Sequence, residues 1–232
     1  MKKALRIIGV IAVVVVLFAA IITSMTHKTP NSEKVWDKDT TIGNMDAENY
    51  FIVYSDIACP YCIAFENAII EHEEEFKEYI EKNDILFEIR LSNFLYKYGE
   101  SRSIESLYGA EAAFCAKNEG KFWDYYNLAV QKVWNEYFKI SGKGAFYEFN
   151  KLGKDYWIDI GKEVGLGDDF ATCVNEDQTE EIISKNAAKT AQMANGLPAF
   201  KFNSYEPGGF DLSWGWDYVL MYFEAGLNSK QK

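Results

Sequence analysis

Two cysteines separated by two residues, Cys59 and Cys62, stand where a buried strand meets a helix. Residues 50–54 read YFIVY, a continuous apolar run that is typical of a strand covered on both faces. Pro60 suits the first turn of the following helix, because its missing N–H costs nothing there. Free backbone N–H groups and the helix dipole favour a thiolate at Cys59, whereas Cys62 lies one turn further in. This order predicts a redox pair, with Cys59 as the nucleophile and Cys62 as the resolving thiol.

Two other uses of such a pair have less support. A zinc site needs a second pair of ligands at suitable spacing, and the remaining soft ligands are Cys115, Cys173, His27 and His72. These four residues form no such pair, so we expect no metal and no other cofactor. A purely structural disulfide is also disfavoured, because so short a loop removes little entropy from the unfolded chain.

The segment after the cysteine pair has the periodicity of one long amphipathic helix. Its apolar side includes Phe65 and His72, and its solvent side carries Glu66, Glu71, Glu73, Glu74, Glu75 and Glu78. Residues 85–91 then predict a second strand, and a strand-helix-strand crossover of this length indicates a parallel pair. Residues 41–92 are therefore expected to form one half of an α/β domain.

The middle of the chain has a different sequence pattern from the strand-helix-strand segment before it. Residues 93–195 contain several segments of helical periodicity separated by glycines, which predict a helical domain inserted between strands. Sheet character returns at 199–203 and at 210–212, and a Pro-Gly-Gly turn between them predicts a hairpin. A last helix is expected over about residues 213–225. Residues 196–232 would thus complete the α/β domain.

The first 26 residues are expected to form a membrane anchor. Lys2, Lys3 and Arg6 precede an apolar run that is longer than the roughly 7–15 residues of a cleavable signal. Its length suits a membrane span of about 20 residues, and the basic flank places the N-terminus in the cytoplasm. Residues 27–40 read as a polar tether. We expect a single-pass membrane protein with its catalytic domain outside the cytoplasm, and a cleaved, secreted form is the alternative.

The other two cysteines, Cys115 and Cys173, both lie on the apolar side of predicted helices. Outside the cytoplasm thiols persist as disulfides, so a structural bond between them is the favoured interpretation. Two buried free thiols acting as small hydrophobic side chains are the alternative.

The charge of the chain bears on its partners. The net charge is −11, and no stretch after residue 28 gathers enough lysine and arginine for a basic groove. A nucleic-acid partner is therefore not expected.

Several separated motifs together resemble the DsbA-like family of thioredoxin-fold thiol-disulfide oxidoreductases. Residues 54–62 read YSDIACPYC and follow IGNMDA at 42–47. The helical region contains AAFCA at 112–116 and GKFW at 120–123, and GLPAF stands at 196–200. The resemblance covers roughly residues 41–226, and this ordered combination is far more specific than the cysteine pair alone. It implies a thioredoxin-like fold with an inserted helical domain.

The resemblance also implies roles for single residues. Pro198 would be a cis-proline beside the sulfurs, and Leu197 would offer its backbone to an extended substrate segment. Pro60 and Tyr61 would support the active site as the two residues between the cysteines. The chain departs from the family at Val53, where several members have a buried acid. Proton transfer from Cys62 would then depend on water or on Asp56, which can equally be a simple turn former at the strand end.

These features predict a disulfide-forming oxidase that passes the Cys59–Cys62 disulfide to secreted or surface proteins with reduced cysteines. A quinone-linked thiol oxidase in the membrane would reoxidise the pair. The alternative is a thiol reductase or disulfide isomerase that a membrane electron donor keeps reduced. A non-catalytic, membrane-anchored binding module is a third hypothesis. The residues between the cysteines do not decide, because both directions use the same exchange chemistry.

Overall fold

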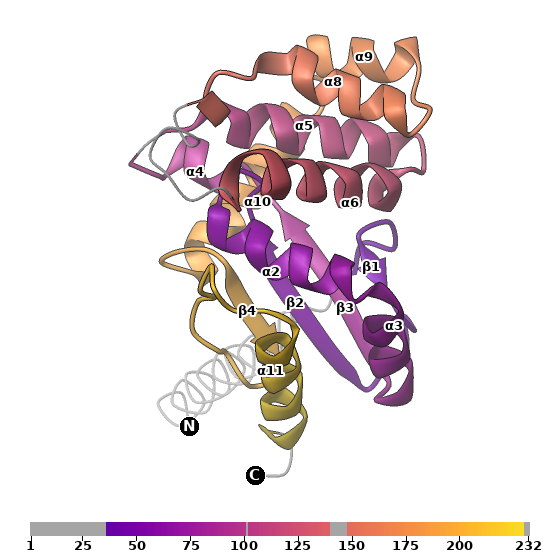
Figure 1. Cartoon of the computed structure of the whole chain (residues 1–232), viewed down its shortest axis with the longest axis vertical. Helices are drawn as coiled ribbons and strands as arrows, with labels where there is room; N and C mark the ends of the chain where they lie inside the picture. The colour runs from indigo at the N-terminus through magenta and orange to yellow at the C-terminus, as the bar shows by residue number, and fades with distance from the viewer. Residues whose placement is uncertain (1–35, 101, 140–147, 230–232) are drawn as a thin grey trace, which may run out of the picture. The chain divides into compact units, whose positions relative to one another are not determined.

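The computed structural model describes residues 36–100, 102–139 and 148–229. Its strands form one mixed sheet in the order β1-β3-β2-β4 (Figure 1). The strands are β1 Thr41–Ile42, β2 Asn49–Ser55, β3 Ile85–Leu91 and β4 Ala199–Phe202. The helices are α2 Pro60–Glu71, α3 Glu73–Lys82, α4 Phe94–Lys97, α5 Ile104–Asn118, α6 Phe122–Val133, the π-helix η2 Trp134–Phe138, α8 Gly153–Glu163, α9 Asp168–Asn175, α10 Glu180–Met193 and α11 Trp216–Asn228.

The centre of the sheet is the parallel pair β2 and β3, as the crossover predicts. Phe51 lies opposite Phe87 and Val53 opposite Ile89, and all four side chains are buried. β1 pairs antiparallel with β3, and β4 pairs antiparallel with β2. The continuous apolar character of β2 is explained by this central position, because helices cover both faces of such strands.

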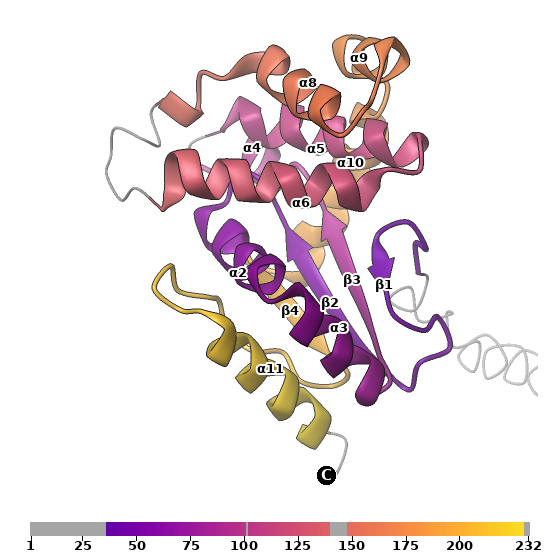
Figure 2. The same cartoon turned by 45° about the vertical axis from the view of Figure 1, so that its right-hand side comes forward.

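Phe51 is the centre of an aromatic core between the sheet and helices α2, α3 and α11, which lie over the same face in Figures 1 and 2. Its ring contacts Phe65 and Phe223 edge-on, with centroids 6.1 Å and 4.8 Å away, and stacks on Phe202 at 5.4 Å. A Cβ atom on Gly226 of α11 would lie 2.0 Å from the Phe202 ring. Only glycine therefore permits this close approach of α11 to β4.

A disulfide between Cys115 and Cys173 joins α5 to α9 in the helical domain, with an S–S distance of 2.02 Å. Both cysteines are buried, and Thr179 lies beside Cys115 and donates its hydroxyl proton to the Glu111 carbonyl. The bond closes a loop over a sequence separation of 58 residues. It thereby restricts the unfolded chain across most of the helical domain.

Removal of this disulfide by the double substitution Cys115→Ala and Cys173→Ala is expected to lower the free energy of unfolding by about 4 kcal/mol. The reason is the loop-closure entropy that the unfolded chain regains. Urea unfolding measures the change. Wild-type protein in which this bond is reduced is the control, and its free energy of unfolding should fall by a similar amount. Alkylation and mass mapping that find free Cys115 and Cys173 thiols in exported protein would contradict the bond itself.

The segment expected as one helix after the cysteine pair is broken at His72, which has φ −122° and ψ 35°. The His72 ring stacks on Trp216 of α11, with centroids 5.4 Å apart and planes 11° apart. The Trp216 Nε1–H donates to Glu75 at 2.8 Å. These contacts with a distant helix hold His72 outside helical geometry, which the local periodicity does not reveal.

The predicted hairpin does not form, because residues 210–212 do not pair with β4. Phe210 is instead buried edge-on against Phe65, with centroids 5.3 Å apart. Asp211 accepts hydrogen bonds from the N–H and the hydroxyl of Ser213, and the Tyr222 hydroxyl donates to the Gly209 carbonyl at 2.7 Å. Such local side-chain bonds compete with a strand ladder, so α11 begins later than the expected residue 213.

The last residues of the predicted tether are held against the domain rather than free. The side chains of Asp37 and Lys117 form an ion pair, and the Ile89 N–H donates to the Thr40 carbonyl at 3.0 Å. The predicted anchor at residues 1–26 lies outside the described residues. Within residues 36–100, 102–139 and 148–229, none of the helices has the length and apolar character that a membrane crossing requires.

Candidate active site

The cysteine pair lies at the carboxyl end of β2, where a short loop leads into α2. The Cys59 N–H donates to the Asp56 carbonyl at 2.9 Å, and the Cys59 carbonyl accepts the Ile63 N–H of the first helical turn at 3.0 Å. Pro60 is the first residue of α2. Cys59 is 4% exposed, Cys62 is fully buried, and Tyr61 between them is 46% exposed. An incoming thiol therefore reaches Cys59 and not Cys62.

Cys62 is held in its protonated form. Burial is the main cause that raises the pKa of its thiol well above the usual value, and a hydrogen bond with Cys59 acts in the same direction. The negative charges of Cys59 and Glu66 raise the Cys62 pKa further. Whenever Cys62 changes between thiol and thiolate, a nearby group or water must therefore carry its proton.

The Asp56 carboxyl fixes the loop before the cysteines through three hydrogen bonds. One oxygen accepts the Ala58 N–H at 2.9 Å, and the other accepts the Leu95 N–H at 2.7 Å and the Ser106 hydroxyl at 2.6 Å. Burial raises the pKa of Asp56 to about 6, although these three hydrogen bonds oppose the rise. Because both oxygens are occupied, the carboxyl ties β2 to α4 and α5, which favours the turn-forming role over proton transfer.

Glu66 is the site residue that the sequence pattern placed wrongly. It was expected on the solvent side of the helix, but its side chain is buried under α6, and the Tyr126 hydroxyl donates to its Oε2 at 2.8 Å. Burial raises the pKa of Glu66 to about 8. The signal that could have revealed it is its spacing of four residues from Cys62, which puts both side chains on one helix face.

The strand position at which the family resemblance implies a buried acid is apolar here. Val53 is fully buried and lies between Ile89 of β3 and Phe200 of β4. Glu66 of α2, one helical turn from Cys62, is a buried acid on a different element.

The Leu197–Pro198 peptide bond is cis, and this segment faces the cysteine pair. The Cys59 thiol donates to the Leu197 carbonyl at 3.6 Å. A cavity of about 430 Å³ extends from this segment along β4 to Glu206 and Gly209. The cavity places open space beside Leu197, whose carbonyl accepts the Cys59 thiol, next to backbone groups that an extended chain could pair with.

The described part of the chain has no group of side chains that could form a metal site. Among residues 36–100, 102–139 and 148–229, no three histidine, cysteine, aspartate or glutamate side chains lie close enough together to hold an ion.

Comparisons with known proteins agree with this geometry. A search of curated protein sequences finds no match. The chain has the fold of a thioredoxin-like oxidoreductase from Silicibacter pomeroyi DSS-3 (TM-score 0.54, 20% identity, 82% of this chain and 92% of that chain). A second similar structure is the thiol-disulfide exchange protein alpha-DsbA2 from Wolbachia pipientis (TM-score 0.55, 19% identity, 84% of this chain and 91% of that chain). A third similar structure is the reduced form of the disulfide bond oxidoreductase DsbG from Mycobacterium tuberculosis (TM-score 0.53, 18% identity, 81% and 85%).

The family assignment rests on sequence as well as on fold. The family model described as Thioredoxin matches residues 36–206, a stretch that includes the cysteine pair, the helical domain and Pro198. The chain therefore belongs to the thioredoxin family and has the fold of its DsbA-like members.

Proposed function

We propose that the chain is a thiol-disulfide oxidoreductase that acts outside the cytoplasm as a disulfide-forming oxidase. The observation that carries the proposal is the placement of Cys59 at the start of α2, accessible at its edge, with Cys62 buried one turn behind it. The Leu197 carbonyl and the adjoining cavity offer a place for an extended substrate segment. Tyr61, exposed between the cysteines, would contact that segment.

The exchange follows from the positions of the two sulfurs. A substrate thiolate attacks Cys59 Sγ of the Cys59–Cys62 disulfide, a bond forms between the two sulfurs, and Cys62 leaves as a thiolate that takes up a proton. A second substrate thiolate then attacks the substrate sulfur of the mixed disulfide. Cys59 leaves as a thiolate, and the substrate gains a disulfide while the protein retains two reduced cysteines.

The oxidase direction is supported by the second cysteine pair. A structural disulfide between Cys115 and Cys173 suits an oxidising compartment, where a dithiol such as Cys59 and Cys62 can be kept oxidised. Within this proposal the N-terminal segment anchors the domain to the membrane, and a quinone-linked thiol oxidase regenerates the disulfide. The substrates would be secreted or surface proteins with reduced cysteines.

The redox state of the pair in intact cells tests the direction of electron flow. Rapid acid quenching followed by alkylation should find Cys59 and Cys62 mostly as a disulfide, because a regenerating oxidase keeps the pair oxidised between turnovers. The bonded Cys115 and Cys173 serve as the internal reference. A pair found mostly reduced would instead favour a reductase or an isomerase.

A further inference from the structure

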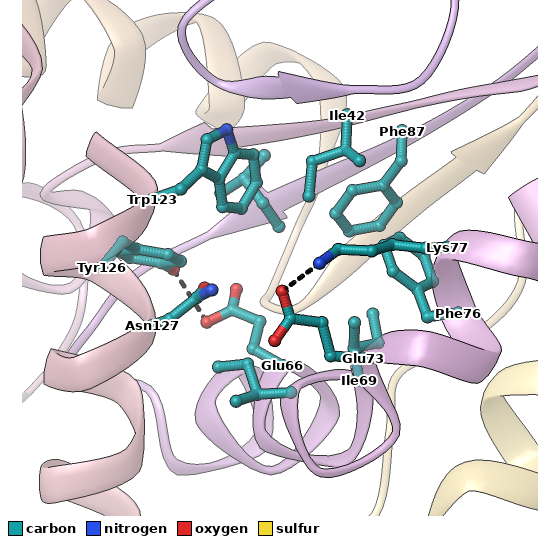
Figure 3. A pocket seen from close by; sticks show the side chains of 12 residues that line it. Ile42, Glu66, Ile69, Glu73, Phe76, Lys77, Phe87, Trp123, Tyr126 and Asn127 are labelled. Carbon is teal, nitrogen blue, oxygen red and sulfur yellow. Dashed lines mark hydrogen bonds and ion pairs between the residues drawn. The ribbon is translucent and has the colours of Figure 1, made fainter. Parts of the chain in front are cut away.

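A small pocket is lined by Glu66 at one end of its wall of side chains (Figure 3). Side chains from β1, β3, α2, α3 and α6 form its walls, which combine apolar side chains with the charged Glu66, Glu73 and Lys77. Ile42, Ile69, Phe87 and Trp123 are among them, as Figure 3 shows. The pocket thus lies between the sheet and the inserted helical domain.

Two buried polar atoms in this pocket have no hydrogen-bond partner among the described residues. They are Glu66 Oε1 and Trp123 Nε1, whereas the second Glu66 oxygen is bonded to Tyr126. The volume accessible to water is about 30 Å³, which exceeds the roughly 10–15 Å³ that one buried water needs. Polar atoms that are left unpaired in a cavity of this size are where buried water binds.

The outer end of the pocket is charged. Lys77 and Glu73 form an ion pair with a distance of 2.6 Å, and both side chains are about half exposed. At the inner end, Glu66 lies one helical turn from Cys62 on the same face of α2, a spacing that puts two Cβ atoms about 5–6 Å apart. The charge of Glu66 acts on the pKa of Cys62, so the two groups are close enough to interact.

We propose that Glu66 exchanges the proton of Cys62 with solvent and that this pocket is the route. The inference rests on the proposed thiol-disulfide exchange. It assigns to Glu66 the task that neither Val53, which is apolar, nor Asp56, whose oxygens are occupied, can perform.

The step balances within the exchange. When a substrate thiolate attacks Cys59, the Cys59–Cys62 bond breaks and its electron pair goes to Cys62 Sγ. The Glu66 carboxyl gives its proton to that sulfur, directly or through one water, and becomes a carboxylate. A proton from water in the pocket then restores the carboxyl. In the reverse reaction Glu66 takes the proton from Cys62 before Cys62 attacks the mixed disulfide.

The ionisable groups around this pair are few. They are Cys59 directly before α2, Asp56 in the preceding loop, Tyr126 on α6, and Glu73 with Lys77 on α3. Burial raises the pKa of Glu66 to about 8, so its carboxyl holds a transferable proton at neutral pH. Above this pH the donor is lost.

The test is single-turnover oxidation of a cysteine-containing peptide by the oxidised full-length protein, with each rate divided by the thiolate fraction of the peptide. The corrected rate of the wild type should fall above about pH 8. Glu66→Gln should be slower below that pH by about tenfold or more, and its profile should be flat. Glu111→Gln, which removes a buried carboxyl on α5 that does not line this pocket, is the matched control and should keep the wild-type profile.

A second variant tests the pocket while Glu66 is kept. Ile70→Ala widens the pocket and lets water solvate the Glu66 carboxylate, so the midpoint of the pH profile should move to lower pH. Ile182→Ala, the same change at an exposed isoleucine on α10, should leave the midpoint unmoved.

The outcomes separate the possible failures. A Glu66→Gln profile that keeps its pH step would overturn the role of Glu66 as proton donor. Equal midpoints for the two isoleucine variants would overturn the pocket as the route. A wild-type protein that oxidises the peptide at no pH would overturn the exchange reaction itself, and the proton route with it.

Discussion

Replacement of Cys59 by serine is expected to reduce thiol-disulfide exchange to the uncatalysed background. The hydroxyl of serine is not a nucleophile toward disulfides, and no disulfide can then form with Cys62. The measurement is the oxidation of a reduced, unfolded protein in a glutathione buffer. Of the two active-site sulfurs only Cys59 is accessible to a substrate, since Cys62 is fully buried, so no second nucleophile can take its place.

Cys62→Ser should have a different effect that identifies the roles of the two sulfurs. Cys59 remains reactive in this variant, but a mixed disulfide with a substrate can no longer be resolved from within the protein. Substrates should therefore accumulate as covalent adducts, visible as larger species on non-reducing gels. The double variant Cys115→Ala and Cys173→Ala is the control, because it should retain exchange. If Cys59→Ser formed covalent adducts with substrates or kept full exchange activity, a residue other than Cys59 would be the nucleophile.

The free energy of unfolding is expected to fall as the pH rises from about 4.5 to about 8. Burial raises the pKa of Glu66 to about 8, from an ordinary value near 4.5 in the unfolded chain. The folded state therefore binds a proton in this range that the unfolded state has already released. The contribution of Glu66 to the free energy of unfolding is fully present below pH 4.5. It is lost as the pH rises to 8, at up to about 1.4 kcal/mol per pH unit.

Two other buried carboxyls should add to this slope. Burial and the neighbouring Asp177 raise the pKa of Glu111 to about 8, and burial raises the pKa of Asp56 to about 6. Urea unfolding of the reduced protein at pH 5, 6.5 and 8 measures the effect. Glu66→Gln and Glu111→Gln should each flatten the curve, whereas Glu81→Gln at an exposed position should not. A stability that rises between pH 5 and 8 would contradict the protonated, buried state of these groups.

The reacting pair itself could be predicted from local sequence. A buried strand, a loop and a helix that begins at Pro60 lie within a few residues of each other, and each has its own signal. Helical periodicity likewise predicted the longer helices between β3 and β4, because these helices bury one face. The positions of Leu197 and Pro198 followed from a resemblance, since no local rule brings residue 197 to residue 59.

Burial of polar groups could not be predicted in this way. Glu66 precedes a glutamate-rich stretch at residues 71–78, so its own segment indicates a solvated face. Only α6, which follows it by more than fifty residues, brings Tyr126 over that carboxyl. The break at His72 and the loss of the hairpin at residues 210–212 have the same origin, because Trp216 and Tyr222 on α11 make the contacts that cause them.

The sequence by itself thus predicted the cysteine pair and the elements that carry it, because strand, turn and helix signals act over a few residues. The tertiary structure alone decided where the proton of Cys62 can go. Helix geometry puts Glu66 on the same face as Cys62, but the environment of that face depends on the distant helices that pack on it. A carboxyl has its ordinary acidity in water and a raised pKa under Tyr126 and Trp123, and that difference arises only when the chain is folded.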